Sequence, residues 1–108
     1  MEAIINLDKL ENIYELNLSP LPNYVIETII NQNIFTIEIK TFWNEETRIT
    51  ITKGSMLLCN NANFKQLLNL NYFSDYKQGA FFFLASFEKE NYNYKNLNEE
   101  LRLYYGDF

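Results

Sequence analysis

Apolar and polar residues alternate over much of the middle of the chain. Between residues 33 and 43, apolar residues recur at every second position, as Phe35, Ile37 and Ile39 show. Residues 47–52 alternate in the same way. Successive side chains of a strand point to opposite faces of its sheet, so each segment predicts a half-buried strand. The short polar loop between the two segments predicts a hairpin.

Other segments predict further short strands. Residues 13–18 and 101–105 also alternate, residues 24–30 are rich in β-branched side chains, and the runs 56–58 and 79–87 are apolar. Turn-forming or polar breaks separate these segments, at Ser19–Asn23, Asn31–Asn33, Lys53–Ser55 and Asn60–Asn63. Helical spacing is found at residues 64–70. The chain is therefore predicted to be mainly all-β, a small antiparallel β-barrel or sandwich of about six or seven short strands with at most one short helix.

Length and composition fit a single domain. The chain has 108 residues, 47% of them hydrophobic, which is enough for one core. We interpret residues 1–108 as one β-rich domain, with residues 1–12 as a candidate N-terminal arm because the pattern there is ambiguous. The start has no basic, strongly apolar leader, and no run reaches the roughly 18 apolar residues of a membrane span. With Cys59 as its one cysteine, the chain is expected to be a soluble protein made in a reducing compartment.

The net charge of −5 argues against nucleic-acid binding, because phosphate recognition needs clustered Lys and Arg. Most of the imbalance lies in the first forty residues, whose carboxylates are Glu2, Asp8, Glu11, Glu15, Glu27 and Glu38. This acidic region could meet a basic partner or simply favour solubility.

Aromatic residues are abundant, at 17% of the chain. Exposed rings could stack on single-stranded nucleic acid, but the acidic balance provides little positive potential to follow a phosphate backbone. A stripe such as Tyr72, Phe73 and Tyr76 is therefore interpreted as core or protein interface.

The sequence offers little for catalysis. It has no histidine, the usual base beside a nucleophile, and Cys59 has the apolar neighbours of a small buried hydrophobe. The pairs Glu45–Glu46 and Glu99–Glu100 could serve glycoside or metal chemistry, although adjacent carboxylates in polar segments are usually solvated loop charges. Three scattered glycines cannot build a phosphate-binding loop. We predict no enzyme activity and no cofactor, with a small enzyme using the Glu pairs as one alternative.

The order of segments between Tyr14 and Tyr105 resembles the small baseplate plug family of contractile-tailed phages. The resemblance is carried by a Pro-Leu-Pro-Asn break, two alternating strands across a polar loop, a Lys-Gly turn, a Gly-started apolar strand and a closing tail. These elements correspond to Ser19–Asn23, Asn33–Trp43, Thr47–Thr52, Lys53–Gly54, Gly79–Leu84, Tyr94–Leu97 and Arg102–Tyr105. Two departures are visible. Asn98 stands where the family often has Gly, and Trp43 precedes the loop although the family's Trp usually follows it.

This resemblance implies a non-enzymatic structural component of a phage contractile-tail baseplate, which plugs or bridges the central hub and spike region. Its implied partners are baseplate hub and spike proteins and the tail tube, without nucleic acid or membrane. A ring-like homo-oligomer within the assembly is expected. The implied location is the virion, in the tail baseplate, after synthesis in the host cytoplasm.

The closing segment supplies the candidate interface residues. Alternation predicts that Leu101, Leu103 and Tyr105 face the core, while Arg102 and Tyr104 point outward. Tyr and Arg are enriched in protein interfaces. The predicted interface is Leu97, Arg102, Tyr104 and Tyr105, with ordinary core packing as the open alternative for the two tyrosines.

A second function is compatible with the charge pattern. The chain could be a small acidic phage-encoded inhibitor that binds a basic site on a host or nuclease protein. In that case Glu2, Asp8, Glu11 and Glu15 would make the contacts.

Overall fold

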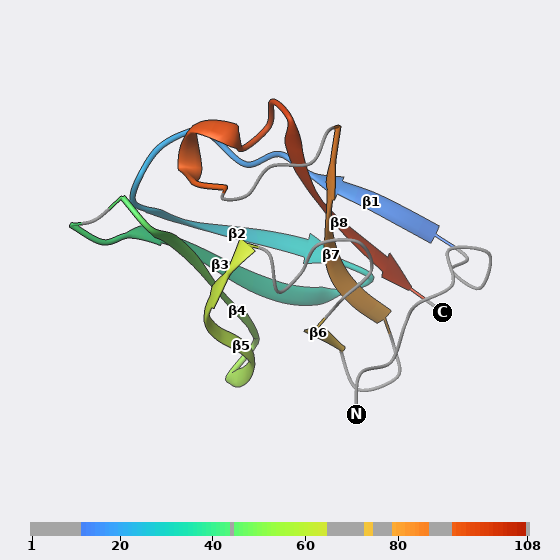
Figure 1. Ribbon diagram of the computed structural model, residues 1–108. Coiled ribbons are helices and arrows are strands. Elements are labelled where there is room, and N and C mark those ends of the chain that lie inside the picture. Colours follow the sequence, from blue (N-terminus) through green and yellow to red (C-terminus); the bar gives the residue numbers. More distant parts are fainter. Residues whose placement is uncertain (1–11, 44, 65–72, 75–78, 87–91, 108) are drawn as a thin grey trace.

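The computed structural model describes residues 12–43, 45–64, 73–74, 79–86 and 92–107. These residues form two four-stranded sheets and one short 3₁₀ turn (Figure 1). The elements in chain order are β1 (Asn12–Leu16), β2 (Tyr24–Ile30), β3 (Asn33–Thr41), β4 (Thr47–Lys53), β5 (Met56–Asn63), β6 (Phe73–Ser74), β7 (Gly79–Ala85), η3 (Tyr94–Asn96) and β8 (Leu101–Asp107).

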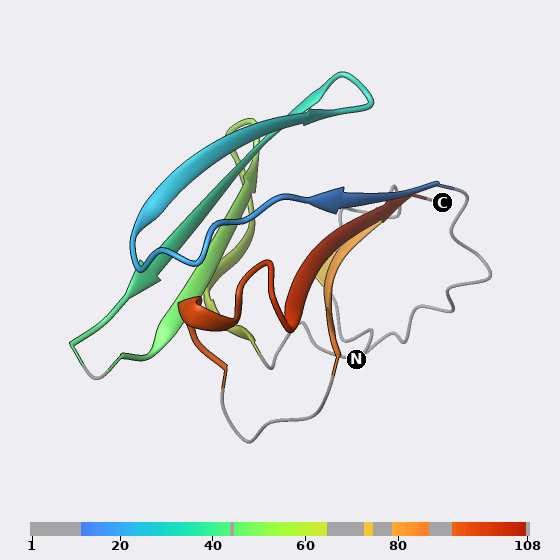
Figure 2. The same ribbon diagram turned by 90° about the horizontal axis from the view of Figure 1, so that it is seen from above.

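The two sheets pack face to face, and every strand pair within them is antiparallel (Figure 2). One sheet is the meander β2-β3-β4-β5, in which each strand follows its neighbour along the chain. The other has the order β1-β8-β7-β6, so it joins the first and last described strands. The predicted all-β class is confirmed, and the architecture is a sandwich.

The core lies between the sheets and contains the residues that alternation assigned to it. Phe35 of β3 contacts Phe81 of β7 and Tyr105 of β8, with ring centroids 5.2 and 5.1 Å apart. The other fully buried core residues of β3, β4, β7 and β8 include Ile37, Ile39, Ile49, Ile51, Phe83, Leu101 and Leu103. Because both inner faces are apolar at every second residue, neither sheet could leave the other without exposing its half of the core.

The β2–β3 hairpin confirms the turn predicted around Asn31. Its two loop residues, Asn31 and Gln32, have φ angles of 52° and 67°. Two consecutive residues with positive φ form the type I′ turn that matches the twist of a hairpin. Asn31 then donates from Nδ2 to Asp107 Oδ2 over 2.7 Å, so the turn is tied to the end of β8 in the opposite sheet.

The break predicted at Asn60–Asn63 is wrong, because these residues belong to β5. The strand stays paired with β4 through register shifts, and Asn61 adopts a φ of 48°. Cys59 and Ala62 face the core, while Asn60 and Asn61 are exposed. As β5 is an end strand of its sheet, its polar side chains remain in water, and a polar run costs little there.

Several predictions fall on residues outside the described ones. Of the predicted helix at 64–70, only Phe64 is described, and it is buried against Phe83. The side chains of the stripe Tyr72, Phe73 and Tyr76 are not described. Of the predicted N-terminal arm, only Asn12 is described, and it is the first residue of β1.

Candidate functional site

Two of the four predicted interface residues are core residues, which corrects the expectation that their side chains meet a partner. Leu97 is fully buried and forms a bridge with Leu101 at the start of β8. Tyr105 is 3% exposed, and its ring packs on Phe35 and Phe81. Tyr105 is two residues from Leu103 and four from Leu101, so it points to the same inner face of β8. The alternative of core packing is therefore correct for this tyrosine.

Arg102 and Tyr104 lie on the outer face of β8, where Glu15 of β1 joins them. Arg102 Nη1 donates to Glu15 Oε1 over 2.8 Å, and the Tyr104 hydroxyl donates to the same oxygen over 3.5 Å. The Tyr104 ring also stacks on Phe82 of β7 at 5.8 Å. We call Glu15, Arg102 and Tyr104 the β8 face.

Charges within the β8 face compensate one another. The hydrogen bond and the charge of Glu15 raise the pKa of Arg102. Partial burial, followed by the negative charge of Glu15, raises the pKa of the Tyr104 hydroxyl. The face therefore presents a neutral ion pair beside an aromatic ring, and whether Arg102 and Tyr104 contact a partner stays a prediction.

The most exposed large hydrophobic side chain among the described residues is Trp43, which was not among the predicted interface residues. It is 96% exposed at the loop between β3 and β4. The backbone of that loop is closed by two hydrogen bonds, from Phe42 N to Glu46 O and from Glu45 N to Phe42 O, both 2.9 Å long. We call residues 41–43 and 45–47 the Trp43 hairpin.

The sequence did not predict the exposure of Trp43, because the alternation along β3 predicts that this side chain is buried. Continued from Phe35 through Ile39, the pattern would turn Trp43 toward the core. Strand β3 ends at Thr41, however, and Glu45 adopts a φ of 63° in the turn. The signal that could have found Trp43 is its place beside the polar loop, which is where the alternation stops.

An open hollow of about 300 Å³ lies beside Trp43, lined by Phe42, Trp43, Glu46 and Arg48. Arg48 is held over it by an ion pair with Glu46 at 2.8 Å and by donation to Asn61 O at 2.9 Å. The Arg48 guanidinium lies 6.0 Å from the centre of the Phe42 ring. An aromatic wall with one fixed ion pair can accommodate an apolar side chain and a polar group next to it.

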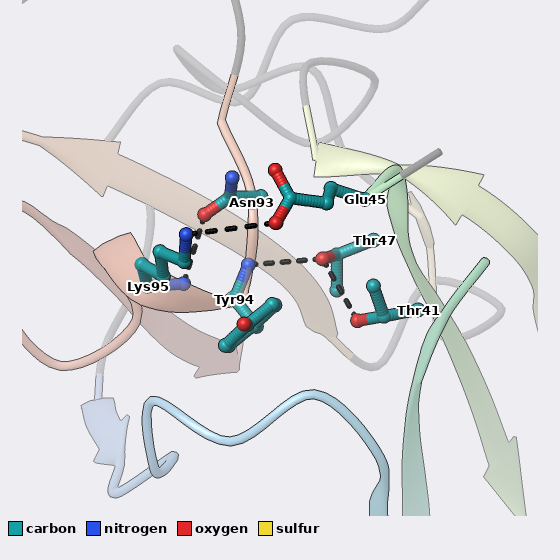
Figure 3. A network of polar contacts seen from close by, with 6 residues as sticks. All are labelled: Thr41, Glu45, Thr47, Asn93, Tyr94 and Lys95. Carbon is teal, nitrogen blue, oxygen red and sulfur yellow. Dashed lines mark hydrogen bonds and ion pairs between the residues drawn. The ribbon is translucent and has the colours of Figure 1, made fainter. Parts of the chain in front are cut away.

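The segment before β8 braces the Trp43 hairpin (Figure 3). Tyr94 N donates to Thr47 Oγ1 over 2.9 Å, and Thr47 Oγ1 lies 3.0 Å from Thr41 Oγ1. Lys95 Nζ lies 3.7 Å from Glu45 Oε1. Through these contacts the hairpin is attached to η3 as well as to its own sheet. Trp43 is thus presented from a fixed base, which reduces the entropy lost when a partner binds it.

The carboxylates named from the sequence as candidate chemical groups are engaged in ion pairs or hydrogen bonds within the chain wherever a partner is described. Within the described part of the chain, no three Cys, Asp or Glu side chains gather in a way that could hold a metal ion. Glu45 and Glu46 each pair with a nearby cation, and Glu100 Oε2 accepts from Asn96 Nδ2 over 2.6 Å. No helix among the described residues is long and apolar enough to cross a membrane.

Cys59 is buried, as its neighbours in the sequence predicted. Its Sγ donates to Ile49 O over 3.4 Å in the core. Burial raises the pKa of the Cys59 thiol to about 11, and backbone hydrogen bonds lower it less. The thiolate is the nucleophilic form, so this cysteine is unreactive near neutral pH.

No protein-family model and no curated protein matches the chain in sequence. The candidate site therefore rests on geometry, and its main feature is the exposed Trp43 on a braced hairpin.

Proposed function

We propose that the protein is a non-enzymatic structural component of a phage contractile-tail baseplate, which plugs or bridges the central hub and spike region. The observation that carries its protein-contact role is the exposure of Trp43 on the braced hairpin. The resemblance of the closing segment Arg102–Tyr105 and of the preceding strands to baseplate plugs supports the assembly.

In this proposal Trp43 enters a pocket on a hub or spike protein. Trp is enriched among interface residues whose truncation costs about 2 kcal/mol or more. The ion pair of Glu46 and Arg48 beside it is partly exposed, so it can exchange water for polar groups of the partner. The β8 face is a second contact, either with the tail tube or with the next copy in a ring.

Asn98 adds support to the proposed family relation. The plug family often has Gly at this position, and Asn98 has a φ of 60°. Gly and Asn are the residues that enter this left-handed region most readily, so the two residue types satisfy the same backbone requirement.

The proposal is tested by mass spectrometry of gradient-purified phage or tail particles from the source strain. We expect the chain at a low, fixed copy number beside hub and spike proteins. Absence from the particles together with abundance in the lysate would reject the baseplate role.

No specific observation favours the inhibitor alternative. Of its four carboxylates, Glu2, Asp8 and Glu11 lie outside the described residues. Glu15 is already bonded to Arg102 and Tyr104 within the chain, which reduces its capacity to bind a basic partner.

A further inference from the structure

Strand β2 has an open edge. It is the end strand of its sheet, and among the described residues no strand pairs with its other side. In a two-residue hairpin the pair next to the turn, here Ile30 and Asn33, is hydrogen-bonded, and such pairs alternate along the strands. It follows that Val25, Glu27 and Ile29 direct their backbone N–H and C=O groups away from β3.

The same three residues place their side chains on the outer face of the sheet. Val25 is 57% exposed and Ile29 is 71% exposed, and Glu27 between them is exposed as well. Ile34, which pairs with Ile29 across the strands, is 49% exposed. Natural edge strands are commonly protected by Pro, charged side chains, a bulge or short length, and Glu27 is the one charged residue of β2. Strand β2 has seven residues in continuous register and no proline.

The charge on this face is acidic. Glu27 and Glu38 make no ion pair with another described residue, and Glu38 lies opposite Val25 on β3. Lys40, the next outward residue of β3, lies beyond the last β2–β3 pair, Tyr24 with Ile39, and its Nζ is 5.5 Å from the centre of the Phe42 ring. An occupant of the edge would therefore meet apolar groups interrupted by carboxylates that form no ion pair within the described part of the chain.

A second copy of the chain fits this edge poorly. Antiparallel pairing of β2 with its own copy uses all three outward residues only when the two-fold axis passes midway between the two copies of residue 27. That register places Glu27 directly opposite the partner's Glu27, and like charges directly opposite each other are destabilising. Either neighbouring register loses one of the three outward pairs.

We propose that the β2 edge binds an extended segment of another protein as an added strand. The segment carries apolar, basic and apolar side chains at successive alternate positions, with the basic residue opposite Glu27. Backbone hydrogen bonds to Val25, Glu27 and Ile29 supply affinity, and the Glu27 charge selects the sequence. This inference does not depend on the baseplate assignment.

The test is selection of a random library of displayed ten-residue peptides on the purified protein. We expect enriched peptides to read apolar–basic–apolar at alternate positions. In the complex, hydrogen exchange of the Val25, Glu27 and Ile29 amides should slow, whereas the amides of Ile26 and Thr28 are already protected by β3. Replacing the basic residue of a selected peptide by Glu should weaken binding by roughly tenfold.

Variants of the protein make the test specific. Selection on Glu27→Lys should enrich acidic residues at the central position. Glu99→Lys is the matched control, because it changes the net charge equally at an exposed turn residue outside β2, and it should leave the preference unchanged.

Three results would overturn the proposal. They are the absence of any enriched peptide, binding without slower exchange at the three amides, and a basic preference that survives Glu27→Lys. Sedimentation of the free protein adds a fourth, since a wild-type dimer at neutral pH with these amides protected would make a second copy the occupant. Each readout uses the isolated protein, so it is independent of whether the chain is found in tail particles.

Discussion

At the residue scale, two aromatic side chains of similar chemistry differ in their solvent exposure. Phe35 and Trp43 both belong to the β3 region and share the same sequence parity, yet Phe35 is fully buried and Trp43 is almost fully exposed. Phe35 is held between Phe81 and Tyr105. The different surroundings predict different consequences for the two truncations.

Trp43→Ala is expected to change the free energy of unfolding by less than about 0.5 kcal/mol, because the ring contributes little to the fold. Under the proposed function, incorporation of the variant into tail particles should fall at least tenfold. Urea unfolding and quantitative mass spectrometry of particles measure the two effects. Met56→Ala, an exposed truncation at the start of β5 opposite Lys53, is the control and should be incorporated normally. Normal incorporation of Trp43→Ala would remove the hairpin from the interface.

Cys59 predicts a pH dependence of stability. Its thiol pKa is raised from 9.0 to about 11 in the folded state. Between these values the unfolded chain releases the proton and the folded chain keeps it, so the unfolded state gains stability as pH rises. From pH 8 to pH 10.5, the wild type should lose about 2 kcal/mol more unfolding free energy than Cys59→Ala. Denaturant titrations at both pH values measure this difference, and equal losses would show that the thiol is not buried.

At the element scale, the need for a positive φ angle explains the turns better than the chemistry of their side chains does. The β2–β3 turn needs positive φ at two consecutive positions, and Gln32 supplies one of them without the tolerance of Gly or Asn. Asn98 meets the same requirement before β8 with a more suitable side chain.

Gln32→Gly should therefore stabilise the protein by about 0.5–1 kcal/mol, because relief of the left-handed strain exceeds the added freedom of the unfolded chain. Asn98→Gly should gain less. Thermal unfolding of both variants provides the comparison. Ser55→Gly changes a turn residue without positive φ, so it should not stabilise, and an equal gain there would point to a general glycine effect.

At the scale of the whole molecule, a few polar contacts fix how the sheets meet. Thr47 is buried, and its hydroxyl connects the β3–β4 hairpin to η3 through Tyr94 N. Asp107, at the end of β8, accepts hydrogen bonds from Asn12 of β1 and from Asn31 of the β2–β3 turn, and so connects the two sheets. Hydrophobic burial drives the sheets together, and these contacts select one relative placement.

Thr47→Val should cost about 1–3 kcal/mol, because it keeps the shape of the side chain but leaves the Tyr94 N–H without its acceptor. The exchange of that amide should also become faster. Thr36→Val is the matched control in β3, since the Thr36 hydroxyl has no hydrogen-bond partner within the described part of the chain. Equal costs for the two variants would mean that the bond to η3 contributes nothing.

The sequence predicted the β class and most strand positions along the chain because those features are local. Alternation at Phe35, Ile37 and Ile39 identified one buried face, and the turn around Asn31 was readable from residue type. The polar run Asn60–Asn63 was wrongly predicted to be a break. The free-energy cost of polar residues in a strand depends on whether the strand is central or at an edge of its sheet. Of the candidate site, Arg102 and Tyr104 were placed outward correctly, and Leu97 and Tyr105 are core residues.

By itself, then, the sequence determined most of the residues that extend or turn and which faces are apolar, since these depend on dihedral preference and on the period of two. The tertiary structure alone decided that β3 ends before Trp43, that Leu97 is covered and that β2 is an end strand among the described ones. Those three outcomes depend on which elements meet across the sandwich. Residues far apart in the chain, such as Thr47 and Tyr94, make those contacts, and no local pattern encodes their distance in space.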